Sequence, residues 1–210
     1  MKNNTYSLKE EAINIYSHFF GIIMGVVALF LMSNKALESG SFEKGLSYII
    51  YSLSVIILYS ASTLYHSSKD KEKRFKMKIF DHCAIFVLIA GSYTPYGLVV
   101  MGGRQGYLLV FVAWTVAFIG IILKCFFTGR FKILSTFMYV MMGWIVVFFI
   151  KPLMNSISDL GLQWLIWGGA FYTTGAVIYS IKKIPYNHAI FHLFVLLGSF
   201  CHFISIYLYS

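Results

Sequence analysis

Seven long apolar runs occupy most of this 210-residue chain and decide what it can fold into. Each run is about 20 residues long, the length that an α-helix needs to cross the hydrocarbon core of a bilayer. The sequence is 59% hydrophobic and only 12% charged, so a water-soluble core could not bury its apolar surface. The predicted helices are approximately residues 15–33, 46–66, 79–100, 107–127, 132–151, 161–181 and 188–208.

We therefore predict an all-α integral membrane protein, with a single seven-helix transmembrane bundle over residues 1–210. Helices satisfy their own backbone polar groups in lipid, and these runs lack the alternation of a membrane β-barrel. The first run has no short apolar core before a small-residue cleavage site, so we expect a retained helix. The three cysteines all lie inside apolar runs and indicate neither a disulfide framework nor a thiolate zinc site.

The basic residues predict how the bundle is oriented. If the helices alternate across the membrane, one side holds only Lys35, Lys44, Arg104 and Lys151 of the 17 Lys and Arg. Positive charge stays on the cytoplasmic side, so the N-terminus is predicted to be cytoplasmic and the C-terminus outside, in the cell (plasma) membrane. This orientation accounts for the net charge of +9, and no nucleic-acid partner is expected.

Several ionisable residues are predicted to meet at one depth near the cytoplasmic face. His66 ends the second helix, Asp81 begins the third, and His188 and His192 lie in the first two turns of the last. Residues four apart share a helix face, which pairs His188 with His192 and Ser62 with His66. Ionisable groups within a membrane are costly, and they usually mark a functional site.

Three neutral imidazoles with an open fourth position are typical of a catalytic zinc ion. We expect His66, His188 and His192 to bind Zn²⁺. Asp81 would hold a water molecule and serve as general base, while Ser62 would orient His66 or donate to a developing oxyanion. Simpler explanations exist for each residue alone: interfacial histidines, and an aspartate that caps the third helix.

The remaining polar and helix-breaking residues are expected to be structural. Asp81 and His82 diverge by about 100° on a helix, so we expect His82 to face away from the site. His18 is expected to pack, with a supporting role at the metal as the alternative. His202 lies about 15 Å further along the last helix and is expected to form an interhelical hydrogen bond. Pro95 is expected to kink or end the third helix.

These segments resemble the hemolysin III family, the bacterial branch of the progestin and adipoQ receptor superfamily that includes the adiponectin receptors. The matching segments are EEAINIYSHFFG, the SxxxH pair Ser62–His66, FDHCAIFVLIAGSYTP with Asp81, and HAIFHLFVLLGSFCHF with His188 and His192. The resemblance implies seven helices and a zinc ion near the cytoplasmic face, bound by the three histidines, with an aspartate that holds the water. It also connects the chain to membrane hydrolases such as alkaline ceramidases.

Three functions follow from these patterns. The first is a zinc-dependent hydrolase that acts on the amide or ester bond of a membrane lipid, as a ceramidase does. The second is a pore-forming cytolysin, and the third is a non-catalytic sensor of membrane state in which zinc clamps two helices together. The sequence does not determine the substrate, the cellular metal or the oligomeric state, nor whether the last helix begins at Asn187 or directly after Pro185.

Overall fold

Helices account for nearly all of the described chain, residues 6–128 and 132–210 of this computed structural model. In chain order they are α1 (Leu8–Ser39), α2 (Phe42–Ser67), α3 (Lys71–Pro95), the π-helix η1 (Tyr96–Met101), α4 (Gly103–Phe127), α5 (Lys132–Gly143), the 3₁₀ helix η2 (Ile145–Phe149), α6 (Ile150–Met154), α7 (Asp159–Ser180) and α8 (Asn187–Tyr209). Within the described residues, six helical segments are long and apolar enough to span a membrane. The fold is thus an all-helical bundle of a multi-pass membrane protein. Two of the basic residues predicted on the cytoplasmic side, Lys2 and Arg130, lie outside the described residues.

The predicted runs are largely helical, although the first and third helices begin about two turns earlier than expected, at Leu8 and Lys71. The N-cap of α3 is Asp70, so Asp81 does not cap the third helix. Ser7 caps α1, because its hydroxyl accepts a hydrogen bond from the backbone N–H of Glu10 at 3.2 Å. Ser7 and Glu10 have the spacing of a capping box, which satisfies free N–H groups at a helix start. This local signal outweighs the lower hydrophobicity of the first turns.

The predicted span over 132–151 is long and apolar enough to cross a membrane, but it is not one continuous α-helix. α5 ends at Gly143, and the chain continues through the 3₁₀ turns of η2 into the short helix α6. Glycine weakens a helix interior. Pro152 cannot donate to the carbonyl of Phe148, and its ring would clash with that carbonyl in a regular α-helix. Pro95 acts as expected, because α3 ends there and η1 follows.

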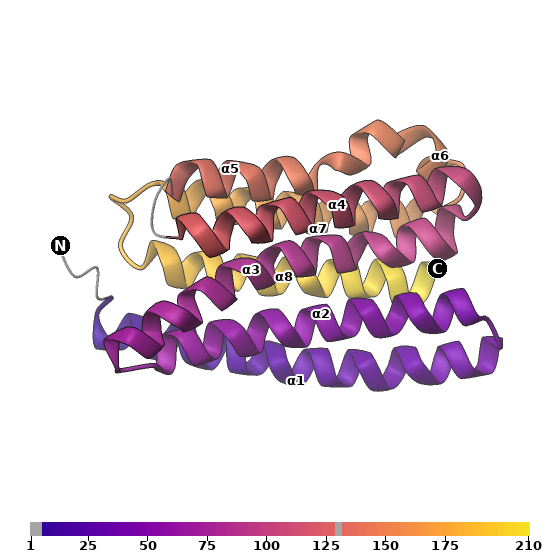
Figure 1. Ribbon diagram of the computed structural model, residues 1–210. Coiled ribbons are helices and arrows are strands. Elements are labelled where there is room, and N and C mark those ends of the chain that lie inside the picture. The colour runs from indigo at the N-terminus through magenta and orange to yellow at the C-terminus, as the bar shows by residue number, and fades with distance from the viewer. Residues whose placement is uncertain (1–5, 129–131) are drawn as a thin grey trace.

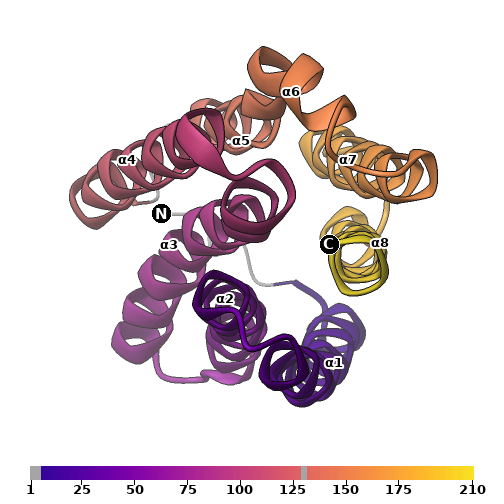
Figure 2. The same ribbon diagram turned by 90° about the vertical axis from the view of Figure 1, so that its right-hand side faces the viewer.

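The helices run alternately in opposite directions, so their connections gather at the two ends of the bundle (Figure 1). The start of α1 and the end of α8 lie at opposite ends (Figure 1). Seen along the bundle, the long helices follow one another around a ring in chain order, with α8 next to both α7 and α1 (Figure 2). This closure brings the last helix against the first two.

Large apolar side chains cover the outside of the bundle. Phe118 and Phe148, for example, are 65% and 84% exposed. Each exposed Å² of apolar surface costs roughly 25 cal/mol in water, and contiguous patches of this kind mark contact with lipid or protein. The described surface is therefore suited to the hydrocarbon of a bilayer.

Two glycines bring α1 close to α2. A Cβ atom at Gly21 would lie 2.6 Å from the ring of Tyr59, and one at Gly25 would lie 2.8 Å from the side chain of Ile56. Small residues let membrane helices approach at backbone distance, where van der Waals contact replaces the missing hydrophobic driving force. α1 therefore lies close enough for its polar side chains to reach α2.

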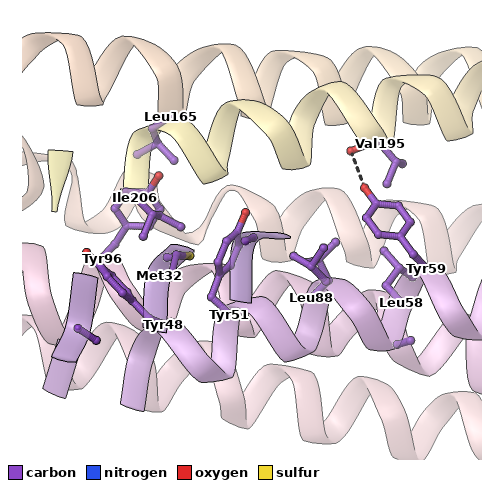
Figure 3. Packing of buried hydrophobic residues seen from close by; sticks show 14 of the residues in the cluster. Met32, Tyr48, Tyr51, Leu58, Tyr59, Leu88, Tyr96, Leu165, Val195 and Ile206 are labelled. Atoms are coloured by element: carbon purple, nitrogen blue, oxygen red, sulfur yellow. Dashed lines mark hydrogen bonds between the residues drawn. The ribbon is translucent and has the colours of Figure 1, made fainter. Parts of the chain in front are cut away.

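Tyrosines of α2 tie that helix to α8. The Tyr59 hydroxyl donates to Ser199 Oγ at 2.7 Å and lies 3.4 Å from the Val195 carbonyl oxygen (Figure 3). The Tyr51 hydroxyl donates to the Ser199 carbonyl at 3.2 Å. Such bonds are strong in a low-dielectric interior. They hold the two histidine-bearing helices in a defined relative position.

Candidate metal centre

Three imidazoles from two helices converge near one end of the bundle. His66 lies in the last turn of α2, and His188 and His192 lie in the first two turns of α8. His188 Nε2 is 3.1 Å from His66 Nε2 and 3.0 Å from His192 Nε2. All three side chains are buried, and one ligand atom from each could bind a single metal ion.

The start of α8 places two of these rings. The helix begins at Asn187, directly after Tyr186, whose φ of 55° turns the chain. The Asn187 amide donates to the Tyr179 carbonyl at 2.8 Å and anchors the helix start to the end of α7. His188 and His192 then share one face of the helix, as the sequence predicts.

The donor set fits a metal ion. Nitrogen ligands about 2.0–2.1 Å from a tetrahedral zinc ion are roughly 3.4 Å apart, close to the two measured separations. A ring nitrogen carries either one proton or one lone pair, so His188 Nε2 cannot form both of its contacts as good hydrogen bonds. A cation, in contrast, attracts all three lone pairs. In the described part of the chain, Nδ1 of His188 and Nδ1 of His192 have no hydrogen-bond partner.

A cavity of about 540 Å³ lies beside this cluster, and its lining includes Ser62, Asp81, His188 and His192. Ser62 and Asp81 are buried. The carboxyl of Asp81 lies near the Ser62 hydroxyl, but that hydroxyl has no described partner at ordinary hydrogen-bond geometry. Asp81 does not belong to the group whose ligand atoms lie within 4.8 Å of one another. Asp81 and Ser62 thus line the cavity, and neither belongs to the group of residues that could bind a metal ion directly.

The expectation that His82 faces away is wrong, because His82 and Asp81 both line this cavity. The cavity is wide enough to be contacted by adjacent residues of α3, which a narrow site would not allow. Lys78 and Lys124 line it as well. Lys124 is buried and donates to Ser135 Oγ at 2.5 Å.

Two further aromatic rings cover the histidines. His18 stacks on His192 with 3.6 Å between ring centroids and 11° between ring planes, which agrees with the expected packing role. Tyr6 stacks on His188 with a centroid distance of 4.7 Å and an angle of 22°. Burial raises the pKa of the Tyr6 phenol, so the ring stays neutral above the cluster.

His202 lies near the backbone carbonyl of Leu165 on α7, the neighbour that the expected interhelical hydrogen bond requires, but at the geometry of an ordinary hydrogen bond the contact is not made. Neither of its ring nitrogens has a hydrogen-bond partner among the residues that the structure describes. The ring instead fills the space beside Gly168, where an added Cβ atom would lie 2.1 Å from His202 Cδ2, and it packs edge-on against Tyr172. The shape of the space beside Gly168 therefore contributes to the placement of this ring.

Sequence reasoning missed Glu11. Its Oε2 atom lies 2.7 Å from His66 Nδ1, and its Oε1 atom pairs with Arg74. The signal was the spacing of Glu11, Asn14 and His18, which are three and four residues apart and so share one face of α1. The same spacing also occurs on helix faces that only pack against a neighbour. The sequence indicates a role at the metal centre only once the helix next to that face is known.

The whole-chain comparison decides the family. The family model of haemolysin-III related proteins matches residues 6–203. The chain belongs to the haemolysin III family. This family lies within the progestin and adipoQ receptor superfamily, as the sequence resemblance predicts.

Relatives of this haemolysin III protein cover nearly its whole length. It is 41% identical over 204 residues to the hemolysin-3 homolog of Bacillus subtilis, covering 97% of this chain and 96% of that protein. It is 39% identical over 209 residues to hemolysin-3 of Bacillus cereus, with 100% and 95% covered. It is also 30% identical over 209 residues to the human monocyte to macrophage differentiation factor, with 95% and 84% covered. The similarity therefore includes every helix that supplies the cluster.

Proposed function

We propose that this haemolysin III protein is a zinc-dependent hydrolase that cleaves an amide or ester bond of a membrane lipid, as a ceramidase does. The observation that supports it most is the convergence of three buried imidazole nitrogens beside a cavity that also holds a buried carboxyl group. The cavity, at about 540 Å³, falls in the usual range for ligand pockets of about 300–1,000 Å³.

The proposal includes seven membrane passes with the metal centre near the cytoplasmic face of the cell membrane. Six passes are the segments described above, and α7 would be the seventh. Two observations support this arrangement: α1 begins and α8 ends at opposite ends of the bundle (Figure 1), and the histidine cluster lies toward the end at which α1 begins. The predicted excess of Lys and Arg at that end agrees with both.

Each residue of the site would have one role. His66, His188 and His192 would hold the ion. When bound, zinc would act as a Lewis acid on a carbonyl oxygen and activate a water molecule. Asp81 would orient the attacking water through a hydrogen bond and accept its proton. Ser62, whose hydroxyl has no partner at ordinary hydrogen-bond geometry in the described chain, would donate a hydrogen bond to the oxygen on which negative charge develops.

The test is hydrolysis by purified, zinc-loaded protein in lipid nanodiscs. We expect release of fatty acid from ceramide or from a fatty-acyl ester, and a fall in rate of about 10²- to 10⁴-fold for Asp81→Asn, because general-base catalysis supplies about that factor. Asp159→Asn removes a comparable charge from an exposed position at the start of α7 and serves as the control. An unchanged rate in Asp81→Asn would exclude this carboxylate as the base.

Absence of turnover has a different meaning. If the wild type binds zinc and loses thermal stability on zinc removal, yet hydrolyses neither lipid class, then zinc clamps α2 to α8 as in the sensor hypothesis. That outcome would replace the hydrolase while leaving the metal ligands in place.

A pore-forming cytolysin is the second candidate, favoured by the similarity to hemolysin-3 of Bacillus cereus. A pore would not need the metal ligands. Dye release from vesicles is therefore the measurement that separates the two functions. Equal leakage from the wild type and from a variant with both His188→Ala and His192→Ala would support the pore and argue against the zinc enzyme.

A further inference from the structure

A carboxylate from α1 reaches the back of one predicted ligand. Glu11 Oε2 is 2.7 Å from His66 Nδ1, on the opposite side of the ring from the Nε2 atom that faces His188. The His66 side chain is fully buried, and the Glu11 side chain is 16% exposed. The contact therefore joins an imidazole inside the bundle to a carboxylate at its edge.

This contact decides which nitrogen of His66 carries the proton. An ionised carboxylate can only accept hydrogen bonds, so His66 Nδ1 must be the donor. Nε2 of the neutral ring then presents a lone pair toward His188 and His192. Asn14 Nδ2 also lies 3.4 Å from His66 Nδ1, but the shorter, charge-assisted contact dominates. As placed, the Asn14 N–H and the His66 Nδ1–H would both be donors facing each other. Turning the Asn14 amide by half a turn exchanges its nitrogen and oxygen, so that Asn14 Oδ1 accepts from His66 Nδ1 instead.

Glu11 is itself held by Arg74. The guanidinium pairs with Glu11 Oε1 through Nη2, and its Nη1 donates to the carbonyls of Tyr65, His66 and Ser68 at 3.3, 3.2 and 3.2 Å. These carbonyls end α2, where a positive charge is favourable. Arg74 thus fixes the carboxylate against the same helix end that carries His66.

We propose that Glu11, held by Arg74, is a positioning residue that keeps the His66 lone pair directed at the metal. The proposal rests on the metal site of the proposed function. Metal-binding histidines commonly give their second N–H to a carboxylate, and loss of that partner weakens metal binding about 10- to 100-fold. The first helix, which supplies no metal ligand, would thereby set the affinity of the centre.

The experiment measures zinc affinity by competition with a chromophoric chelator, in purified full-length protein. Glu11→Gln keeps the size of the side chain but loses its charge, and we expect zinc to bind about 10- to 100-fold more weakly. Glu72→Gln is the matched control, since Glu72 pairs with Lys76 at 2.6 Å on the exposed side of α3. We expect Glu72→Gln to leave the affinity unchanged.

Thermal unfolding with and without zinc separates positioning from a general structural role. A structural defect would lower the melting temperature of both forms equally, whereas the proposal expects Glu11→Gln to shrink the increase that zinc produces. Arg74→Lys retains the charge but loses the two-sided guanidinium contact, and it should weaken zinc binding by less than Glu11→Gln. It serves as the second variant if Glu11→Gln does not fold.

The outcomes separate the two proposals. A wild type that binds no zinc overturns the metal site, and the role of Glu11 with it. A wild type that binds zinc, together with undiminished affinity in Glu11→Gln and Arg74→Lys, overturns the role of Glu11 alone and leaves the ligand assignment intact.

Discussion

The start and the middle of α8 bury polar side chains in different ways. At Ser199, the Tyr59 and Tyr172 hydroxyls lie 2.7 and 2.8 Å from Oγ, and the Tyr51 hydroxyl donates to the carbonyl. At the start of the helix, His188 Nε2 instead faces two other ring nitrogens at 3.0 and 3.1 Å. Hydroxyls can donate and accept at once, so these partners satisfy Ser199 within the described residues, whereas the three imidazoles are placed so that they could bind one cation.

Under the proposed function, this difference separates residues that hold the fold together from residues that would bind the metal ion. A satisfied hydroxyl network stabilises helix packing in lipid and requires nothing further. Three buried lone pairs that point at one another would oppose packing, and a metal ion bound between them would remove that cost. Changes in the two regions should therefore be distinguishable by whether they affect zinc binding or only stability.

The largest expected effect is on metal content. Replacing His188 and His192 together by alanine removes two of three ligands, so we expect bound zinc to fall from about one ion per chain to near zero. Metal analysis of the purified protein measures this. Ser199→Ala should retain the ion. Equal zinc content in the wild type, the double histidine variant and Ser199→Ala would show that the histidines do not bind zinc.

Zinc removal should come next in size. A ligand that binds only the folded state at 1,000 times its dissociation constant stabilises by about 4.1 kcal/mol, and a strong chelator removes that contribution. We expect a fall in the melting temperature of the wild type. The variant lacking His188 and His192 should show no fall, and a chelator effect of the same size there would point to zinc bound elsewhere.

Close packing between α1 and α2 should contribute to stability. In Gly21→Ala the new Cβ atom would meet the Tyr59 ring at 2.6 Å, and overpacking of this kind costs about 1–3 kcal/mol. Gly45→Ala is the matched control, because its nearest neighbour, Ala36 Cβ, is 3.9 Å away. Thermal unfolding should show a loss only for Gly21→Ala, and equal stabilities would mean that the helices separate without cost.

The smallest expected effect comes from one hydroxyl of the Ser199 network. Tyr59→Phe removes a buried hydrogen bond and should lower the free energy of unfolding by about 1 kcal/mol, with zinc content unchanged. Tyr16→Phe, at a side chain that is mostly exposed, should have no measurable effect. Loss of zinc in Tyr59→Phe would show that the two regions are coupled.

Much of the candidate site was predictable because it depends on helix ends. Alternating apolar runs place His66, Asp81, His188 and His192 near one end of the bundle wherever the helices lie in the membrane plane. The prediction failed where the rotation of a helix matters. His82 shares the cavity with Asp81 although the two side chains diverge on α3, because the width of a cavity depends on the neighbouring helices.

The sequence by itself determined the membrane helices, since a helix in lipid satisfies its own backbone and needs only a sufficient run of apolar residues. It also determined that His188 and His192 share a face. Only the tertiary structure decided that the three Nε2 atoms face one another and that Glu11 reaches His66. These contacts depend on how closely α1, α2 and α8 approach and how each is rotated, which is the sum of many small packing contacts between distant segments.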